Sequence, residues 1–218
     1  MNLLIMGLPG AGKGTQAEMI VHEFGLLHIS TGDMFREAMK NETKTGLEAK
    51  KYMDAGELVP DEVTNKIVKE RLNQDDVRTH GVLLDGFPRT VDQAEALDGM
   101  LSDLALQLDA VINIKVDPSV LIKRISGRFI CRDCGATYNK PNKMPKVKDV
   151  CDNCSGCDFY QREDDKPETI ANRIVINESQ SAPILSHYQE LDLVTDFDGM
   201  KTIDEITEEI KEFLKMRR

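Results

Sequence analysis

The sequence predicts an α/β fold in which a parallel five-stranded sheet is covered by helices on both faces. Two observations carry this prediction: short apolar runs alternate with longer helix-like segments, and a glycine-rich loop follows the first apolar run. Strands that are separated by helices pair in parallel, because each helix returns the chain to the starting end of the sheet. The chain has 218 residues, which is enough for one such domain with insertions.

The elements follow one another in a regular order. The expected strands are residues 3–6, 27–29, 82–84, 111–116 and 193–197. The expected helices are residues 15–24, 32–40, 46–55, 61–72, 90–106, 118–128, 167–191 and 202–215. Pro60 and Asp61 form a helix-start signal, and Pro118 suits a first helical turn. Pro183 lies inside the longest helical segment and predicts a kink or a break there.

Two segments interrupt the alternation of strands and helices. Residues 31–60 are helical and lie between the second and third strands, whereas residues 129–162 lose the helical pattern and contain all five cysteines. Open α/β sheets bind ligands at the carboxyl ends of their strands. We therefore expect both segments to be inserted parts at the ligand end of the sheet.

Composition excludes several classes of protein. The chain is 40% hydrophobic and 30% charged, a composition that is ordinary for a globular protein. Its formal net charge of −10 argues against general binding to nucleic acid or anionic membranes. No apolar stretch approaches the roughly 20 residues that span a bilayer. The start of the sequence lacks the basic region of a signal peptide, so we expect a cytoplasmic protein.

Residues 7–15 read GLPGAGKGT and lie between the first expected strand and the first expected helix. Backbone N–H groups in such a loop bind phosphate, and glycines let the backbone curl around the anion. Lys13 can reach the outer phosphates of a nucleotide. The phosphate-loop pattern is met at Gly7, Gly12 and Lys13, but its hydroxyl comes one place late, at Thr15, which we expect near magnesium.

The cysteines predict a metal site. Cys131 and Cys134 form one Cys-x-x-Cys pair, and Cys151 and Cys154 form another after sixteen intervening residues. Four thiolates at this spacing suit tetrahedral Zn²⁺, and a site with four protein ligands is structural because no position is left for a reacting water. Cys157 follows Cys154 after two intervening residues and is the alternative fourth ligand.

Further motifs occur in a fixed order: STGDMFR at 30–36, GELVPD at 56–61, LDGFPRT at 84–90 with Gln93 beyond it, REDD at 162–165, and Asn172-Arg173. Together with the glycine-rich loop they resemble the bacterial adenylate kinases of the long type, over essentially the whole chain. The resemblance implies one P-loop kinase domain (residues 1–218) with an AMP-binding segment at 30–60 and a small, ribbon-like β lid holding zinc at 129–162. It also implies a monomer that uses Mg²⁺ in the reaction ATP + AMP ⇌ 2 ADP.

The same resemblance assigns residues to roles. The expected catalytic residues are Lys13, Arg89, Arg124, Arg162 and Arg173. The expected ATP-binding residues are Gly10, Ala11, Gly12, Lys13, Gly14, Thr15, Arg128, Thr137, Tyr138 and Lys201. The expected AMP-binding residues are Thr31, Arg36, Glu57, Leu58, Val59, Gly86, Phe87, Pro88, Arg89, Gln93, Arg162 and Arg173. Arginine suits these places because its planar fork bridges two phosphate oxygens.

Some alternatives stay open at this point. Asp85 and Asp33 are candidates for holding magnesium-bound waters, although Asp33 could instead cap a helix. A related kinase could use UMP or CMP, but the pairing of Thr31 with Gln93 favours AMP. A zinc-ribbon binding module joined to a nucleotide switch is a different class of function, and the lysine-rich run at residues 140–148 would then contact nucleic acid; the acidic chain around it favours a solvated lid loop.

Overall fold

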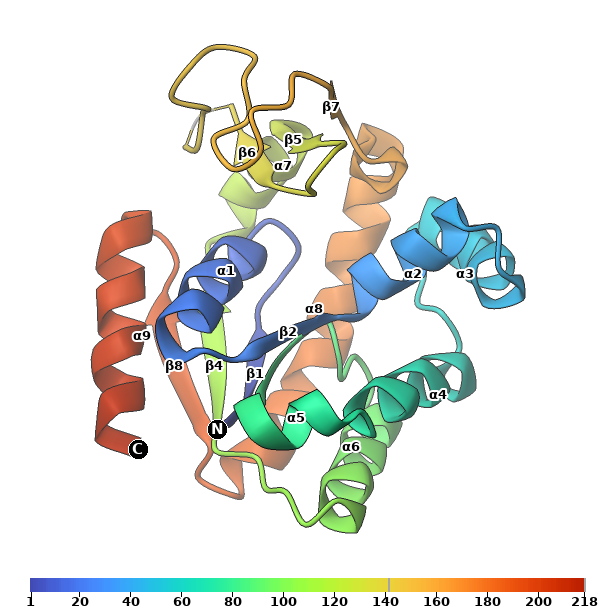
Figure 1. Ribbon diagram of the computed structural model, residues 1–218, viewed down its shortest axis with the longest axis vertical. Coiled ribbons are helices and arrows are strands. Elements are labelled where there is room, and N and C mark those ends of the chain that lie inside the picture. The colour runs from blue at the N-terminus through green and yellow to red at the C-terminus, as the bar shows by residue number, and fades with distance from the viewer. Residues whose placement is uncertain (141, 218) are drawn as a thin grey trace.

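The computed structural model of the chain describes residues 1–140 and 142–217. Its centre is a five-stranded sheet with strand order β2-β3-β1-β4-β8, in which every pair of neighbours is parallel (Figure 1). The strands are β1 (Asn2–Met6), β2 (Leu27–Ser30), β3 (Val82–Asp85), β4 (Ala110–Lys115) and β8 (Val194–Asp198). The predicted sheet is therefore confirmed.

Helices cover both faces of the sheet, and the alternation of side chains along β1 shows why. Leu4 and Met6 belong to one buried cluster, which α4, α5, α6 and α8 complete, whereas Leu3 and Ile5 belong to the other, which α1 and α9 complete. The helices are α1 (Lys13–Phe24), α2 (Thr31–Lys40), α3 (Lys44–Ala55), α4 (Asp61–Leu72), α5 (Asp75–His80), α6 (Val91–Asp103), α7 (Pro118–Ser126), α8 (Pro167–Gln189) and α9 (Ile203–Arg217).

Both interrupting segments lie at the carboxyl end of the strands (Figure 1). The first contains α2 and α3, which pack on each other beyond the end of β2. The second is a three-stranded antiparallel sheet of β5 (Arg128–Cys131), β6 (Thr137–Asn139) and β7 (Phe159–Tyr160), in the order β6-β5-β7. A short 3₁₀ turn (Glu163–Asp165) joins this lid sheet to α8.

The lid has a small core of its own. The rings of Phe129, Tyr138 and Phe159 pack with centroids 5.5–5.6 Å apart, next to Cys131 and Cys151. The lysine-rich run lies in the lid loop, where Lys140, Lys146 and Lys148 are exposed; its residue 141 lies outside the described residues.

The structure departs from the expected elements in three places. Helix α5 was not expected, because six residues are too few to show a helical period. The expected helix at 90–106 is shorter, since Thr90 is the N-cap of α6 and accepts a hydrogen bond from the N–H of Gln93 at 3.1 Å. The predicted break at Pro183 is wrong, because α8 runs through this residue while Ile184 and Tyr188 anchor the helix in the core.

Among the described residues, no helix combines the length and the apolar character needed to span a membrane.

Candidate active site

The glycine-rich loop joins β1 to α1 and exposes the start of that helix. A side chain at Gly7 would place its Cβ 2.6 Å from the carbonyl oxygen of Ile114, so the loop can leave the sheet only with glycine there. Gly12 is the N-cap of α1 with a φ of 101°, and the space where its Cβ would stand is open. Gly10, Ala11, Gly14 and Thr15 surround this helix end. An anion can thus approach the backbone N–H groups closely.

Lys13 lies at the first position of α1 and turns back over the loop. Its Nζ donates hydrogen bonds to the carbonyls of Gly7 at 2.8 Å and Leu8 at 3.2 Å. Burial lowers the pKa of Lys13 to about 8, although the nearby Asp85 carboxylate opposes this shift. The Lys13 ammonium is held by two carbonyl oxygens, and the Asp85 carboxylate does not fully offset its desolvation, so a phosphate would supply the missing negative charge.

Asp85 ends β3, directly beside β1. It lies 3.7 Å from Nε2 of His28, and its pKa is below the ordinary value: burial opposes the shift, but His28 and Lys13 outweigh it. His28 was not expected near the site. Asp33 is the second candidate carboxylate; burial opposes ionisation there too, but Arg36 and Arg162 lower its pKa to about 2. The cap alternative for Asp33 is wrong, because Ser30 is the N-cap of α2.

The segment after β3 bonds to the start of α2. The carbonyl of Gly86 accepts hydrogen bonds from Thr31 Oγ1 and from Arg89 Nε, both at 2.8 Å. The N–H of Arg89 donates to Oε1 of Gln93 at 2.8 Å, and Arg36 pairs with Asp33 at 2.6 Å. Burial, reinforced by the nearby charge of Arg173, lowers the pKa of Arg89 to about 10.

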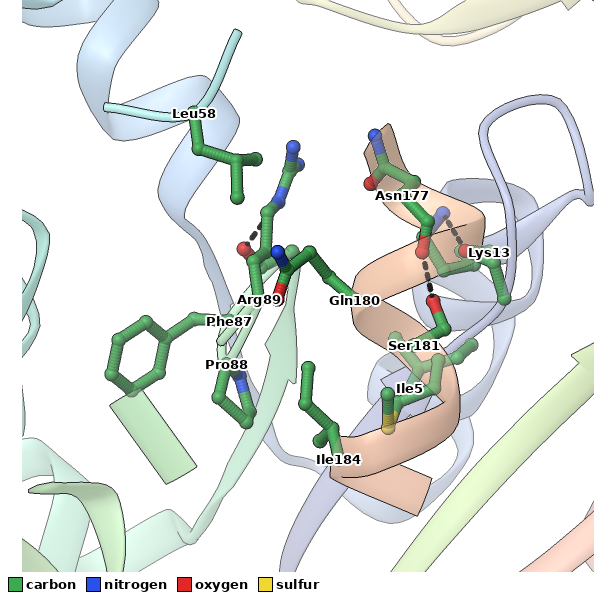
Figure 2. A pocket seen from close by; sticks show the side chains of 13 residues that line it. Ile5, Lys13, Leu58, Phe87, Pro88, Arg89, Asn177, Gln180, Ser181 and Ile184 are labelled. Carbon is green, nitrogen blue, oxygen red and sulfur yellow. Dashed lines mark hydrogen bonds between the residues drawn. The ribbon is translucent and has the colours of Figure 1, made fainter. Parts of the chain in front are cut away.

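One pocket contains residues from both expected substrate sets (Figure 2). Lys13 comes from the loop after β1, Leu58 from the segment before α4, and Arg89 from the segment after β3. Gly86, Phe87 and Pro88 also line it. Helix α8 contributes Asn177, Gln180 and Ser181, which sequence reasoning missed. Their signal was available: Gln180 and Ser181 lie one helical turn before Ile184 and Asn177 lies two turns before it, on a face that is otherwise apolar.

Three more arginines gather around two neighbouring carboxylates. Arg128 donates from Nε to Asp165 Oδ2 at 2.7 Å and also bonds to Oδ1 through Nη2. Arg173 lies 3.1 Å from Asp164 and 3.0 Å from Asp165. Burial and the charges of Arg36 and Arg128 lower the pKa of Arg162 to about 9.

Arg162 shows what this cluster lacks. Its Nε is buried without a hydrogen-bond partner among the described residues, and its Nη2 lies 3.4 Å from Asp33. An unpaired buried donor is costly, and an anion would satisfy it. The arrangement therefore fits the binding of several phosphate groups at once.

Other expected residues contact protein groups in this structure. Arg124 donates through both Nη atoms to the carbonyl of Gly199 at 3.1 Å. Lys201 pairs with Glu209. Tyr138 is 2% exposed, so its side chain faces the lid core, while Thr137 beside it is half-buried. Glu57 is exposed, and Val59 packs in the small core beneath α2 and α3.

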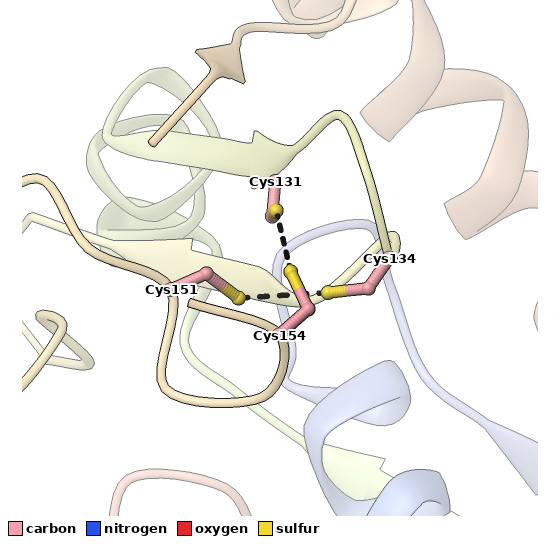
Figure 3. A group of neighbouring side chains, drawn as sticks. All are labelled: Cys131, Cys134, Cys151 and Cys154. Carbon is pink, nitrogen blue, oxygen red and sulfur yellow. Dashed lines mark hydrogen bonds between the residues drawn. The ribbon is translucent and has the colours of Figure 1, made fainter. Parts of the chain in front are cut away.

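Four cysteines meet in the lid (Figure 3). The ligand atoms of Cys131, Cys134, Cys151 and Cys154 all lie within 4.8 Å of one another. The sulfur–sulfur distances of 3.6 Å (Cys131–Cys154) and 3.5 Å (Cys134–Cys151) are close to the roughly 3.8 Å edge of a tetrahedron with Zn–S bonds of about 2.3 Å. Cys157 is exposed outside this group, with its sulfur 3.9 Å from the carbonyl of Ser155. The cluster thus contains Cys154 rather than Cys157.

The surroundings of Cys151 favour a metal ligand. Burial opposes ionisation, but the Tyr138 hydroxyl, which donates to Cys151 Sγ at 3.4 Å, and neighbouring backbone N–H groups lower the pKa of Cys151 to about 6. The thiolate is the form that binds metal. The donor set fits zinc.

Comparisons with known proteins agree with this geometry. The sequence model of the adenylate kinase family matches residues 5–193. The chain is 62% identical to the adenylate kinase of Lactococcus lactis subsp. lactis, over 98% of this chain and 100% of that protein. It is 61% identical to the adenylate kinase of Enterococcus faecalis (98% and 99% covered) and 59% identical to that of Limosilactobacillus reuteri subsp. reuteri (98% of each). The phosphate loop, the cluster of arginines and this full-length similarity agree: the chain belongs to the adenylate kinase family.

Proposed function

We propose that this chain catalyses ATP + AMP ⇌ 2 ADP and so balances the adenine nucleotides. One observation carries the proposal: Lys13 and Arg89 line the same pocket, although they follow two different strands of the sheet. The first group belongs to a phosphate loop, and the second to a separate anion-binding segment. A site with two phosphate-binding groups that face one pocket suits transfer from one nucleotide to another better than hydrolysis of one nucleotide.

The donor side is the loop at residues 7–15. Its N–H groups and Lys13 would hold the β- and γ-phosphates of ATP, while Arg128, Arg162 and Arg173 would neutralise the charge of the moving phosphoryl group. Little covalent work falls to the protein in such a reaction, so positioning and positive charge supply most of the rate. Arg124, Thr137, the backbone at Tyr138 and Lys201 would complete this side when the lid approaches.

The acceptor side is the segment between β2 and α4 together with the segment after β3. Arg36 and Arg89 would hold the AMP phosphate, whereas Thr31, Gln93 and the backbone near Leu58 would contact the base. The AMP phosphate already carries its attacking oxygen, so the site needs no strong general base. Closing the two inserted segments would exclude water, which otherwise accepts the phosphoryl group.

Magnesium is expected with ATP. Asp85 and Asp33 are the residues that would hold its waters, with Thr15 as the nearby hydroxyl, and the depressed pKa of each carboxyl keeps both charged. Bound Mg²⁺ would offset charge on the donor phosphates. Zinc, in contrast, would be structural: the four thiolates leave no open position, and the lid core beside them is small.

We further propose that the chain acts as a monomer in the cytoplasm, with ATP, AMP and ADP as its partners and without nucleic acid or membrane. The net charge of −10 supports the last two points. Size-exclusion chromatography with light scattering would test the monomer directly.

The decisive experiment is a ³¹P NMR assay of the purified protein with Mg²⁺, ATP and AMP. We expect ADP to form from both nucleotides, and none when AMP is omitted. Arg89→Ala should lower the rate by about 10³-fold, by analogy with transition-state arginines. The exposed lid pair Arg132–Asp158 provides the matched control, and Arg132→Ala should leave the rate unchanged.

Three outcomes would contradict the proposal. Phosphate released from ATP alone would indicate an ATPase or a switch. Faster transfer to UMP or CMP than to AMP would indicate a different acceptor. Equal rates for Arg89→Ala and Arg132→Ala would remove Arg89 from the site.

A further inference from the structure

Asp61 connects the two walls of the acceptor site. It is the first residue of α4, and the segment that precedes it contains Leu58. Its Oδ2 accepts a hydrogen bond from Thr90 Oγ1 at 2.6 Å, and its Oδ1 accepts one from Gln93 Nε2 at 2.7 Å. Thr90 and Gln93 form the N-terminal turn of α6. The carboxylate therefore lies where two helix N-termini meet, and both helix dipoles favour its charge.

These contacts fix which way the Gln93 amide points. The N–H of Arg89 can only donate, so the group that faces it at 2.8 Å is the oxygen Oε1. The Asp61 carboxylate can only accept, so the group that faces it is the nitrogen Nε2. If the amide were turned over, its Nε2 donor would face the N–H donor of Arg89, and its Oε1 acceptor would face the Asp61 carboxylate, which also accepts.

We propose that Asp61 is a positioning residue for base selectivity, which acts by holding the Gln93 amide in this single orientation. This inference rests on the proposed function, in which Gln93 contacts the base of AMP. After its two protein contacts, the amide retains one N–H and one oxygen lone pair. The purine edge that matches them offers an acceptor to the N–H and an amino donor to the oxygen.

Adenine offers this pattern, with N1 as the acceptor and the 6-amino group as the donor. A 6-oxopurine offers the reverse, because its N1 carries a proton and its O6 accepts. A fixed amide thus discriminates at both positions, whereas an amide that is free to turn over would serve either base. Asp61 makes the difference although it does not itself contact the base.

Burial strengthens this discrimination. Gln93 is 1% exposed, so bulk water does not reach its amide. A mismatched donor or acceptor then stays unpaired, and an unpaired buried group costs more than an ordinary hydrogen bond contributes. A preference of roughly tenfold or more is expected from one such mismatch.

The test compares AMP with IMP as acceptors, because these nucleotides differ only at the edge in question. The variants are Asp61→Ala and Asp61→Asn, the second of which keeps the size and one carbonyl if the first folds poorly. Glu62→Ala is the matched control, since Glu62 is the next residue, is exposed and shares the first turn of α4. We expect Asp61→Ala to lower the AMP-to-IMP ratio of kcat/KM by about tenfold, Asp61→Asn by less, and Glu62→Ala not at all, with KM for ATP unchanged throughout.

A merely structural role gives a different result. If both Asp61 variants lower kcat/KM for AMP and IMP by the same factor, or leave the ratio unchanged, the inference is overturned. Failure of the unmodified chain to phosphorylate AMP would overturn the proposed function as well, and that result is seen before any substitution is made.

Discussion

Asp165 provides the sharpest test of how the arginine cluster is built. It is fully buried and accepts three hydrogen bonds from two guanidinium groups, those of Arg128 and Arg173. Arg173 has a second carboxylate partner in Asp164, at 3.1 Å. Substituting Asp165 by Asn removes the buried negative charge while keeping the shape, so the loss falls mainly on Arg128.

The size of the effect follows from these contacts. Removing one partner of a buried ion pair costs about 3–5 kcal/mol, because the other charge is left uncompensated. The asparagine carbonyl keeps one acceptor and Arg173 keeps Asp164, so we expect the lower end, about 3 kcal/mol. For a chain of this size that lowers Tm by about 6–12 °C. Arg128 is also expected to lose its fixed direction, so the transfer rate should fall.

The assay is urea unfolding followed by circular dichroism, with zinc in excess so that the lid stays metallated. Asp158→Asn is the matched control, because its pair with Arg132 is exposed and contributes less than about 1 kcal/mol. If Asp165→Asn and Asp158→Asn lose the same free energy of unfolding, then the buried carboxylate does not hold the cluster together, and the reasoning is refuted.

Three further predictions concern the lid and the loop. Cys154→Ser should release zinc and lower Tm by several degrees, whereas Cys157→Ser should change neither the zinc content nor Tm. Metal analysis and calorimetry would measure both quantities. Equal effects of the two substitutions would mean that both sulfurs bind the metal. The charged form of Lys13 is present below its pKa of about 8 and is lost as the pH rises. We therefore expect kcat/KM for ATP to fall about tenfold per pH unit above pH 8. A pH profile that stays flat to about pH 9.5 would contradict this role of Lys13. Glu18 of α1 accepts hydrogen bonds from two lid residues, Lys143 at 3.3 Å and Asn153 at 3.2 Å, so Glu18→Ala should open the lid more often by severalfold. Energy transfer between labels on the lid and α1 would measure this, and an unchanged distribution of distances would show that other contacts hold the lid.

The sheet was predictable because its signals are local. Each strand is a short apolar run, and β1 supplies side chains to both faces of the sheet, which is why its whole length reads as apolar. The metal site was also predictable, because the spacing within and between the two Cys-x-x-Cys pairs can be seen in the sequence. Spacing also favoured Cys154 as the fourth ligand, in agreement with the cluster in the structure, but Cys157 stayed open as an alternative because the sequence does not show how the Ser155–Gly156 turn directs each sulfur.

Contacts between distant segments escaped prediction. Asp165 and Arg128 are separated by 37 positions, and Asp61 and Gln93 by 32, so no sequence window contains either pair. Pro183 failed as a signal for a related reason: propensity describes an isolated helix, whereas buried neighbours such as Tyr188 stabilise this one by packing. Residues that position the site were therefore harder to predict than those that face it.

Strands β1 and β3 are neighbours in the sheet, and this pairing fixes the distance between the segments that follow them. The two strands are direct neighbours, about 4.8 Å apart, and one carries the loop of Lys13 while the other leads to Arg89. Rigid hydrogen-bonded backbone thus sets how far apart the two anchoring points stand, whatever the inserted segments do. In the proposed reaction the inserted segments would bring Arg36 and Arg162 to the phosphates and exclude water, whereas the spacing of the two strands would limit how far the phosphoryl group must travel.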